Sequence, residues 1–190
     1  MKKKIVTAIV LASILATGAA FADSPVHPDG FGIGILGGFG WSGTNVGNVA
    51  LSLKVPALPV FWGINLGIWN HGFSVGVQGD YYFLGSMFGT SPFGWFLGAG
   101  LYVNFATHNQ ERVWQRNGDW YSRQWTRLGV GARLPVGITF QPWQFFEIFG
   151  NVVPSAGVHF FSNRRDWDTD YSGARLGIGV GGEIGLRVWF

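Results

Sequence analysis

The last stretch of the chain, Ser172–Phe190, reads SGARLGIGVGGEIGLRVWF and alternates between two kinds of residue. From Ala174 onward every even position is apolar or glycine, whereas the odd positions hold glycine, three charged residues and a tryptophan. Successive side chains of a β-strand point to opposite sides, so this pattern predicts one long strand with two different faces. An apolar face backed by glycine and a few charges is typical of a strand between lipid and a narrow lumen. The stretch therefore predicts an outer-membrane β-barrel.

The beginning of the chain has the organisation of a secretory signal peptide. Three lysines, Lys2–Lys4, precede an apolar run, and Ala20-Phe21-Ala22 has the small-x-small pattern of a cleavage site. We therefore expect residues 1–22 to be removed and residues 23–190 to form the barrel. A retained N-terminal anchor helix is the alternative interpretation, although the apolar run is short for one.

Composition favours a membrane barrel and excludes several other classes. The formal net charge of +3 equals the charge of the three leader lysines, so the mature chain is close to neutral and offers no basic surface for nucleic acid. Glycine (31 residues) and aromatic residues (17%) are abundant while only 12% of residues are charged, which is unusual for a soluble domain. The chain has no cysteine, which excludes disulfides and thiol chemistry.

The same alternation recurs in eight segments and predicts an all-β fold, an eight-stranded antiparallel up-and-down transmembrane β-barrel. The predicted strands are residues 31–41, 49–55, 60–69, 73–84, 94–107, 123–140, 145–161 and 172–190. Pro154 predicts a bulge in the seventh strand. The two longest and most charged loops, 108–122 and 162–171, then lie at one end, which we expect to face the cell exterior. A soluble lipocalin-like barrel or a β-sandwich is the alternative.

Aromatic residues near the strand ends predict the girdles that mark the two membrane interfaces. These residues are Trp41, Trp62, Trp69, Tyr81, Trp95, Trp125, Trp143, Trp189 and Phe190. The terminal aromatic, Phe190, also resembles the C-terminal assembly signal of bacterial outer-membrane barrels, so the barrel-assembly machinery is an expected partner.

The inward faces of the predicted strands carry charged residues inside a barrel that is barely wide enough for its own side chains. They are Lys54, Asp80, Arg127, Arg133, Glu147, Arg175, Glu183 and Arg187. Charges buried in such a lumen must be paired. The strand positions place Asp80, Arg133 and Glu183 together, and Glu147 near Arg187. One interpretation is a salt-bridged plug that fixes the interior, and the other is a gated or selective pathway for solutes.

The two long loops carry aromatic and basic residues of the kind that dominate protein-binding hot spots. The candidate binding residues are Arg112, Trp114, Arg116, Trp120, Tyr121, Arg164, Arg165 and Trp167. The alternative is that they are interfacial anchors and solvated loop charge. Asp166, Asp168 and Asp170 alternate like calcium ligands, but the glycine and glutamate that complete an EF-hand loop are absent, so no metal site is predicted.

Catalysis has little support in the sequence. His27, His71 and His108 lie in loops or in the lead-in, and His159 lies close to Ser155 without a nucleophile motif around it. The glycines alternate within strands and no helix follows them, so they do not form a phosphate-binding loop. We therefore expect no enzyme activity and no cofactor.

Seven segments spread over most of the mature chain carry structural motifs. They are Phe31-Gly32-Ile33-Gly34-Ile35-Leu36-Gly37, Leu58-Pro59-Val60-Phe61-Trp62, Gly79-Asp80-Tyr81-Tyr82, Leu128–Ile138, Glu147-Ile148-Phe149, Val152–Gly157 and Gly181–Phe190. These segments resemble the small spirochaete outer-membrane barrels that are grouped under a domain of unknown function. That family is similar to the outer-membrane proteins A, X and W, and the resemblance implies the same fold. Some of its members are associated with binding host factors such as complement factor H.

Together these features predict a monomer in the bacterial outer membrane with its loops exposed at the cell surface. The predicted function is structural, or the binding of a surface ligand or host factor through those loops. A narrow channel for small solutes is the alternative. The expected partners are outer-membrane lipid, the barrel-assembly machinery and a host protein ligand, but no nucleic acid.

Overall fold

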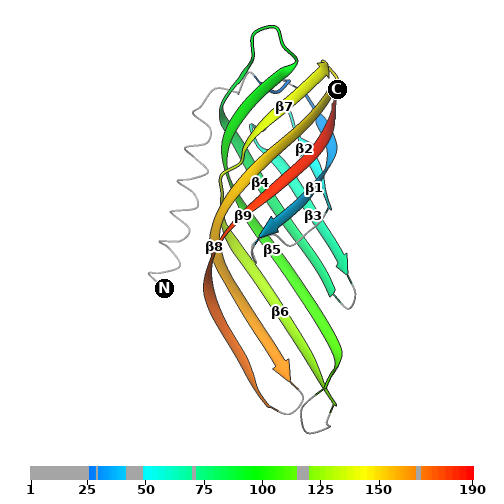
Figure 1. Cartoon of the computed structure of the whole chain (residues 1–190), viewed down its shortest axis with the longest axis vertical. Coiled ribbons are helices and arrows are strands. Elements are labelled where there is room, and N and C mark those ends of the chain that lie inside the picture. The colour runs from blue at the N-terminus through cyan, green and yellow to red at the C-terminus, as the bar shows by residue number, and fades with distance from the viewer. Residues whose placement is uncertain (1–25, 29, 42–48, 70–71, 115–119, 166–167) are drawn as a thin grey trace.

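A computed structural model describes residues 26–28, 30–41, 49–69, 72–114, 120–165 and 168–190, which form an elongated, twisted barrel of antiparallel strands (Figure 1). The strands are β1 (Gly32–Trp41), β2 (Val49–Lys54), β3 (Phe61–Trp69), β4 (Gly72–Met87), β5 (Phe93–Trp114), β6 (Trp120–Arg133), β7 (Val136–Trp143), β8 (Phe146–Arg165) and β9 (Asp168–Trp189). They are rich in β-branched and aromatic residues, which suit a pleated surface that packs on one side. Within these ranges no helix is long and apolar enough to cross a membrane.

The strands close into a ring with eight positions. We call each position a stave, because one of them is filled by two strands in succession. Their order is β4-β3-β2-β1-β9-β8-β6-β5-β7, and the further pairing of β4 with β5 joins the two sides. Both β6 and β7 lie between β5 and β8, one after the other, so they are the two halves of a single stave. The first and last staves pair over the whole length of β1, from Gly32 opposite Trp189 to Trp41 opposite Val180. The predicted antiparallel up-and-down fold is therefore confirmed.

The sixth stave is interrupted at Leu134 and Pro135, where the sequence predicts one continuous strand. Proline has no backbone N–H to donate to a ladder, so regular pairing stops there. The backbone N–H of Leu134 still donates to the carbonyl of Pro154 at 2.9 Å. Val136 follows Arg133 by three positions, and their partners on β8, Val152 and Ser155, are also three positions apart, so the interruption does not change the register. The predicted bulge at Pro154 is wrong, because β8 runs through this residue in even register with β9.

The two faces of the staves differ as the alternation predicts. On β9, Leu176 and Ile178 are each 74% exposed on the outside, whereas Glu183 and Arg187 are buried inside. Seven of the buried apolar residues form one cluster within the ring: Leu36, Ala50, Phe61, Tyr82, Phe96, Phe149 and Trp189. A shell of exposed apolar side chains around an interior of polar and aromatic residues is the inverse of a soluble barrel.

The two ends of the barrel differ in length. Figure 1 shows the β5–β6 and β8–β9 pairs continuing past β1–β4 at the end opposite the C-terminus. We call this the hairpin end, and the other, where Phe190 lies, the C-terminal end. The predicted loop boundaries 108–122 and 162–171 are wrong, because β5 pairs with β6 as far as Trp114 and Trp120, and β8 pairs with β9 as far as Arg165 and Asp168. Charged residues continue these strands because the ladder is made by the backbone and needs no apolar face.

The aromatic girdles are present in part. The side chains of Trp62, Trp95, Trp143 and Phe190 are exposed on the outside of the ring. The prediction that Trp189 belongs to a girdle is wrong, because its side chain is only 5% exposed and belongs to the buried cluster. Its odd position on β9 puts it on the inward face despite its place at the strand end. The side chains of three further predicted members, Trp41, Trp69 and Trp125, fall outside the described residues.

Candidate functional site

The lumen holds a buried cluster formed by Asp80 on β4, Arg133 on β6 and Glu183 on β9, which we call the central ion cluster. The Nη2 atom of Arg133 donates a hydrogen bond to Glu183 Oε2 at 2.7 Å. Its Nε atom lies 2.9 Å from Asp80 Oδ1, although the N–H is not aligned for a hydrogen bond, so this contact is electrostatic. All three side chains are at most 6% exposed. The structure thus brings together the three residues that the strand positions place together.

Amide side chains extend the central ion cluster across the lumen. Gln78 accepts a hydrogen bond from Nη1 of Arg133 and donates one to Glu183 Oε1 at 3.4 Å. Asn151 donates to Glu183 Oε2 at 3.1 Å, and Asn65 donates to Gln78 Oε1 at 3.3 Å. The connected groups come from β3, β4, β6, β8 and β9, so this network ties together staves from both sides of the ring. Connected hydrogen bonds of this kind restrict the motion of a buried polar interior.

A second buried cluster lies nearer the C-terminal end and is centred on Glu147, whose side chain is fully buried. We call it the terminal ion cluster. Glu147 Oε2 accepts hydrogen bonds from Arg187 Nη1 at 3.2 Å and from the indole N–H of Trp189 at 3.0 Å. Its Oε1 atom accepts one from the hydroxyl of Thr139 at 2.9 Å and lies 2.9 Å from His27 Nδ1. The carboxylate therefore has a partner on each side, which a buried charge requires.

A glycine on the neighbouring stave makes room for Arg187. Gly34 lies opposite Arg187, and a Cβ atom there would be 1.9 Å from the carbonyl oxygen of Leu186, so no other residue allows the two strands to approach this closely. The guanidinium of Arg187 lies 4.0 Å from the ring centroid of Phe149, and its Nε atom donates to Ser52 Oγ at 2.8 Å. Stacking on aromatic rings and hydrogen bonds on several sides stabilise this buried cation.

The residue that the sequence interpretation missed is His27. It lies ahead of β1, inside the barrel mouth at the C-terminal end, where it is 8% exposed. Its ring contacts four aromatic rings from three other staves and the last strand: Phe61, Tyr82, Phe96 and Trp189. The carbonyl of the preceding Val26 accepts a hydrogen bond from Gln141. The sequence does hold one clue, which is the short connection between these residues and β1, because it keeps them close to the barrel mouth.

The other predicted lumen charges do not join either cluster. Lys54 is buried beside the ring of Phe61 and donates to the carbonyl of Val55 at 3.1 Å. Arg127 and Arg175 lie toward the hairpin end. Arg127 is half-buried, and Arg175 is exposed with its guanidinium 5.3 Å from the ring centroid of Phe161.

The predicted loop binding residues are placed only by their backbone. Arg112 and Trp114 belong to β5, Trp120 and Tyr121 to β6, and Arg164 and Arg165 to β8. Arg116 and Trp167, and the side chains of all eight, lie outside the described residues, as do the side chains of Asp166, Asp168 and Asp170. Among the side chains that the structure describes, no three histidine, aspartate or glutamate residues form a group that would hold a metal ion.

A small cavity touches both ion clusters. Its lining includes Asp80 and Glu183 of the central ion cluster and Arg187 of the terminal ion cluster, together with the polar residues Ser52 and Gln78 and the apolar residues Leu36 and Phe149. Ion pairs thus cross the lumen at two levels, and aromatic rings pack around His27 near the C-terminal end.

Comparison with known proteins gives one family and two solved structures. A family model described as "Protein of unknown function (DUF3996)" matches residues 28–188. This match confirms the resemblance to a family grouped under a domain of unknown function, whereas its spirochaete origin and its likeness to the outer-membrane proteins A, X and W stay predictions. No protein of curated function matches the chain.

The matching structures are both outer-membrane or surface proteins of bacteria. One is a major outer membrane protein from Thermus thermophilus, which has 11% sequence identity and a TM-score of 0.46 over 82% of this chain and 98% of that chain. The other is Neisserial surface protein A (NspA), which has 15% identity and a TM-score of 0.36 over 84% of this chain and 96% of that chain.

Proposed function

We propose that this chain, which belongs to the DUF3996 family of proteins of unknown function, is an integral β-barrel of the bacterial outer membrane with a closed lumen. The observation that carries this proposal is the distribution of side chains around the ring. Large apolar residues on all sides are exposed on the outside, and every acidic side chain that the structure describes is buried in the lumen against an arginine. Lipid is the solvent that such an exterior requires.

Closure of the lumen favours a structural or binding role over transport. Arg133 connects carboxylates from opposite parts of the ring, and Glu147, Arg187 and His27 fill the C-terminal end. An ion or solute that crosses this lumen has to displace these buried contacts. Eight staves give an interior that side chains alone can fill.

The long hairpins are the part of the barrel that suits a ligand. They lengthen four staves beyond the ring, and the orientation expected for this class, with both termini in the periplasm, puts the hairpin end outside the cell. Residues of the hot-spot type, Trp, Tyr and Arg, are concentrated in their sequence. We propose that these hairpins bind a surface ligand or host protein, that the barrel is a monomer, and that it has no catalytic activity.

Shortening both hairpins tests this role. The register allows an Asn-Gly turn to join Gln110 directly to Arg123, and another to join Asn163 to Tyr171, because both pairs of residues already lie opposite each other. The expected result is a barrel that still folds, as shown by heat-modifiable migration in gels, but loses binding to a panel of host serum and matrix proteins. Each single-hairpin variant identifies the contribution of one hairpin.

The control for this experiment is the unaltered barrel, which has to bind at least one protein of the panel. Absence of binding by the unaltered barrel, or equal binding by the doubly shortened one, would contradict a ligand role for the hairpins.

A narrow channel for small solutes is the second candidate function, and the cavity that touches both ion clusters is the observation that favours it. In this reading the clusters move apart when the channel opens. The two readings differ in their electrical behaviour, because a closed barrel is silent in a lipid bilayer and a channel gives steady unitary currents.

The ends of the chain suit the proposed partners. The backbones of Phe31 and Phe190 exchange two hydrogen bonds, of 3.2 and 2.9 Å, and the side chain of Phe190 is exposed on the outside of the ring. We propose that lipid of the outer membrane surrounds this side chain in the finished barrel and that the barrel-assembly machinery recognises it beforehand.

A further inference from the structure

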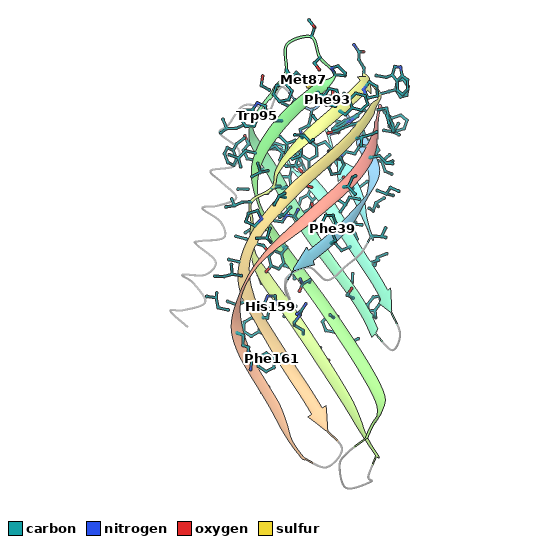
Figure 2. The ribbon with its side chains drawn as sticks, in the orientation of Figure 1. Phe39, Met87, Phe93, Trp95, His159 and Phe161 are labelled. Atoms are coloured by element: carbon teal, nitrogen blue, oxygen red, sulfur yellow. The ribbon has the colours of Figure 1, made fainter. Side chains whose placement is uncertain are left out.

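The inward wall of β5, β6, β8 and β9 between the central ion cluster and the hairpin end carries a separate group of polar side chains. Residues that lie opposite each other on these adjacent strands form a row, and the polar side chains occupy three successive rows. Tyr102 lies in one row, His159 and Arg175 lie opposite each other in the next, and Arg127 lies in the third, opposite Phe161. Figure 2 shows His159 and Phe161 in this part of the barrel, on the hairpin side of the region where most of the drawn side chains lie. We call the four polar residues the donor wall.

Buried polar atoms of the donor wall have no partner in the part of the chain that the structure describes. They are the hydroxyl of Tyr102, the Nε atom of Arg127 and both ring nitrogens of His159. Buried polar atoms nearly always have a hydrogen-bond partner, so each exception needs an explanation. These four atoms belong to residues in three successive rows on the inward faces of adjacent strands, so they lie in one region of the wall.

The donor wall carries positively charged side chains but no acidic ones. The acidic side chains that the structure describes are Asp80, Glu147 and Glu183, and each contacts Arg133 or Arg187 in one of the two ion clusters. Arg127 and Arg175 therefore have no carboxylate partner among the described side chains. A wall with two cationic groups and a hydroxyl donor, but no acid, attracts an anion.

Glycines in this wall leave space for the side chains of the donor wall. A Cβ atom at Gly131 or Gly157 would lie 2.6 or 2.4 Å from the hydroxyl of Tyr102. A Cβ atom at Gly129 would lie 2.8 Å from Nδ1 of His159. The hydroxyl of Tyr102 and the ring of His159 thus lie over glycine backbone of neighbouring strands, and the side-chain amide of Asn104 lies beside His159 over Gly129.

We propose that the donor wall binds a small phosphate-class anion that enters the lumen from the hairpin end. Arginine presents a planar set of donors that matches the oxygens of phosphate, and tyrosine and histidine on the two adjacent staves supply further donors from other directions. Because the wall faces the lumen and not the lipid, the anion is a soluble ion and not a lipid headgroup. This site is distinct from both ion clusters and from the hairpin residues proposed to bind a protein ligand.

Nuclear magnetic resonance of the refolded full barrel in detergent micelles tests the site, with inorganic phosphate as the probe and histidine rings labelled with ¹⁵N. Only four histidines are present, and a His159→Asn variant assigns the signal. We expect the His159 signal to shift saturably with phosphate. We expect Arg127→Gln to weaken binding at least about tenfold, which corresponds to the loss of one charge-assisted hydrogen bond. Tyr102→Phe weakens it less, because it removes a neutral donor.

Matched controls separate a built site from general attraction of anions. Lys54→Gln removes a buried positive charge from the opposite end of the barrel and leaves binding unchanged. Gly129→Ala adds a methyl group that crowds His159, so we expect weaker binding. The nearest atoms to this methyl group belong to side chains and not to the backbone. Heat-modifiable migration verifies that each variant is folded. No saturable shift, or the same shift with acetate at equal ionic strength, or an unchanged affinity in folded Arg127→Gln, would each overturn the proposal.

Discussion

Arg133→Met is expected to lower the free energy of unfolding of the barrel by about 3–5 kcal/mol, because removing one member of a buried ion cluster leaves the others uncompensated. Arg133 is the only cation within contact of Asp80 and Glu183 in the described part of the lumen. Both carboxylates are nearly inaccessible to water, so neither can be solvated when the guanidinium is lost. Urea unfolding of the barrel in lipid vesicles, followed by tryptophan fluorescence, measures the change.

A triple variant is the matched control for this prediction. Asp80→Asn, Arg133→Met and Glu183→Gln together remove every charge of the central ion cluster while keeping the size of its side chains. Replacing a whole buried ion cluster by neutral groups is often close to neutral for stability. We therefore expect the triple variant to be more stable than the single one. A triple variant that is as unstable as Arg133→Met would show that the loss comes from packing and not from unpaired charge.

Glu147→Ala is the second change with a large expected effect, again about 3–5 kcal/mol of unfolding free energy. It leaves the guanidinium of Arg187 buried without an anion, and it removes the acceptor for the indole N–H of Trp189 and the hydroxyl of Thr139. The contact with His27 is lost as well, so the segment before β1 loses an attachment in the barrel mouth. The same urea unfolding experiment, with limited proteolysis to report on the segment before β1, measures both consequences.

Thr139→Val provides the control for the terminal ion cluster. It removes a single neutral donor to Glu147, so we expect a loss of only about 1 kcal/mol. A graded result, with Glu147→Ala several times more costly than Thr139→Val, supports a charge centre that holds the C-terminal end together. If Glu147→Ala remained within about 1 kcal/mol of the unaltered barrel, the terminal ion cluster would have no such role.

The fold was predictable because the strand period is local and repeated. Residues such as Ile33, Leu51 and Leu176 alternate with glycine or polar residues on nearly every stave, so one rule assigns both faces. The same rule places Trp189 inside, because odd positions of this strand face the lumen. The girdle prediction for Trp189 failed because its position at the strand end was given more weight than this alternation. The hairpins were predicted too short because charged residues in β5, β6, β8 and β9 look like loop sequence, although backbone pairing tolerates them.

The candidate site was predictable in part. Inward parity and distance from the strand ends were sufficient to place Asp80, Arg133 and Glu183 at one level and Glu147 with Arg187 at another. The alternation shows which residues face inward but not how the strands tilt. Strand tilt decides which inward residues meet across the ring. The separation of Arg127 and Arg175 from both clusters was therefore not predicted. His27 was missed because it lies outside any strand, where no period assigns a direction to its side chain.

Electrical recording with the unaltered barrel in planar lipid bilayers is the most direct test of a membrane barrel with a closed lumen. Heat-modifiable migration and resistance to protease in vesicles of the same lipid establish that the folded protein has inserted. For the inserted barrel we predict no steady unitary current at moderate voltage, because ion clusters and the segment around His27 close the lumen at successive levels. Steady unitary currents from the unaltered barrel, or failure of the folded protein to insert, would contradict the proposed structure–function relationship.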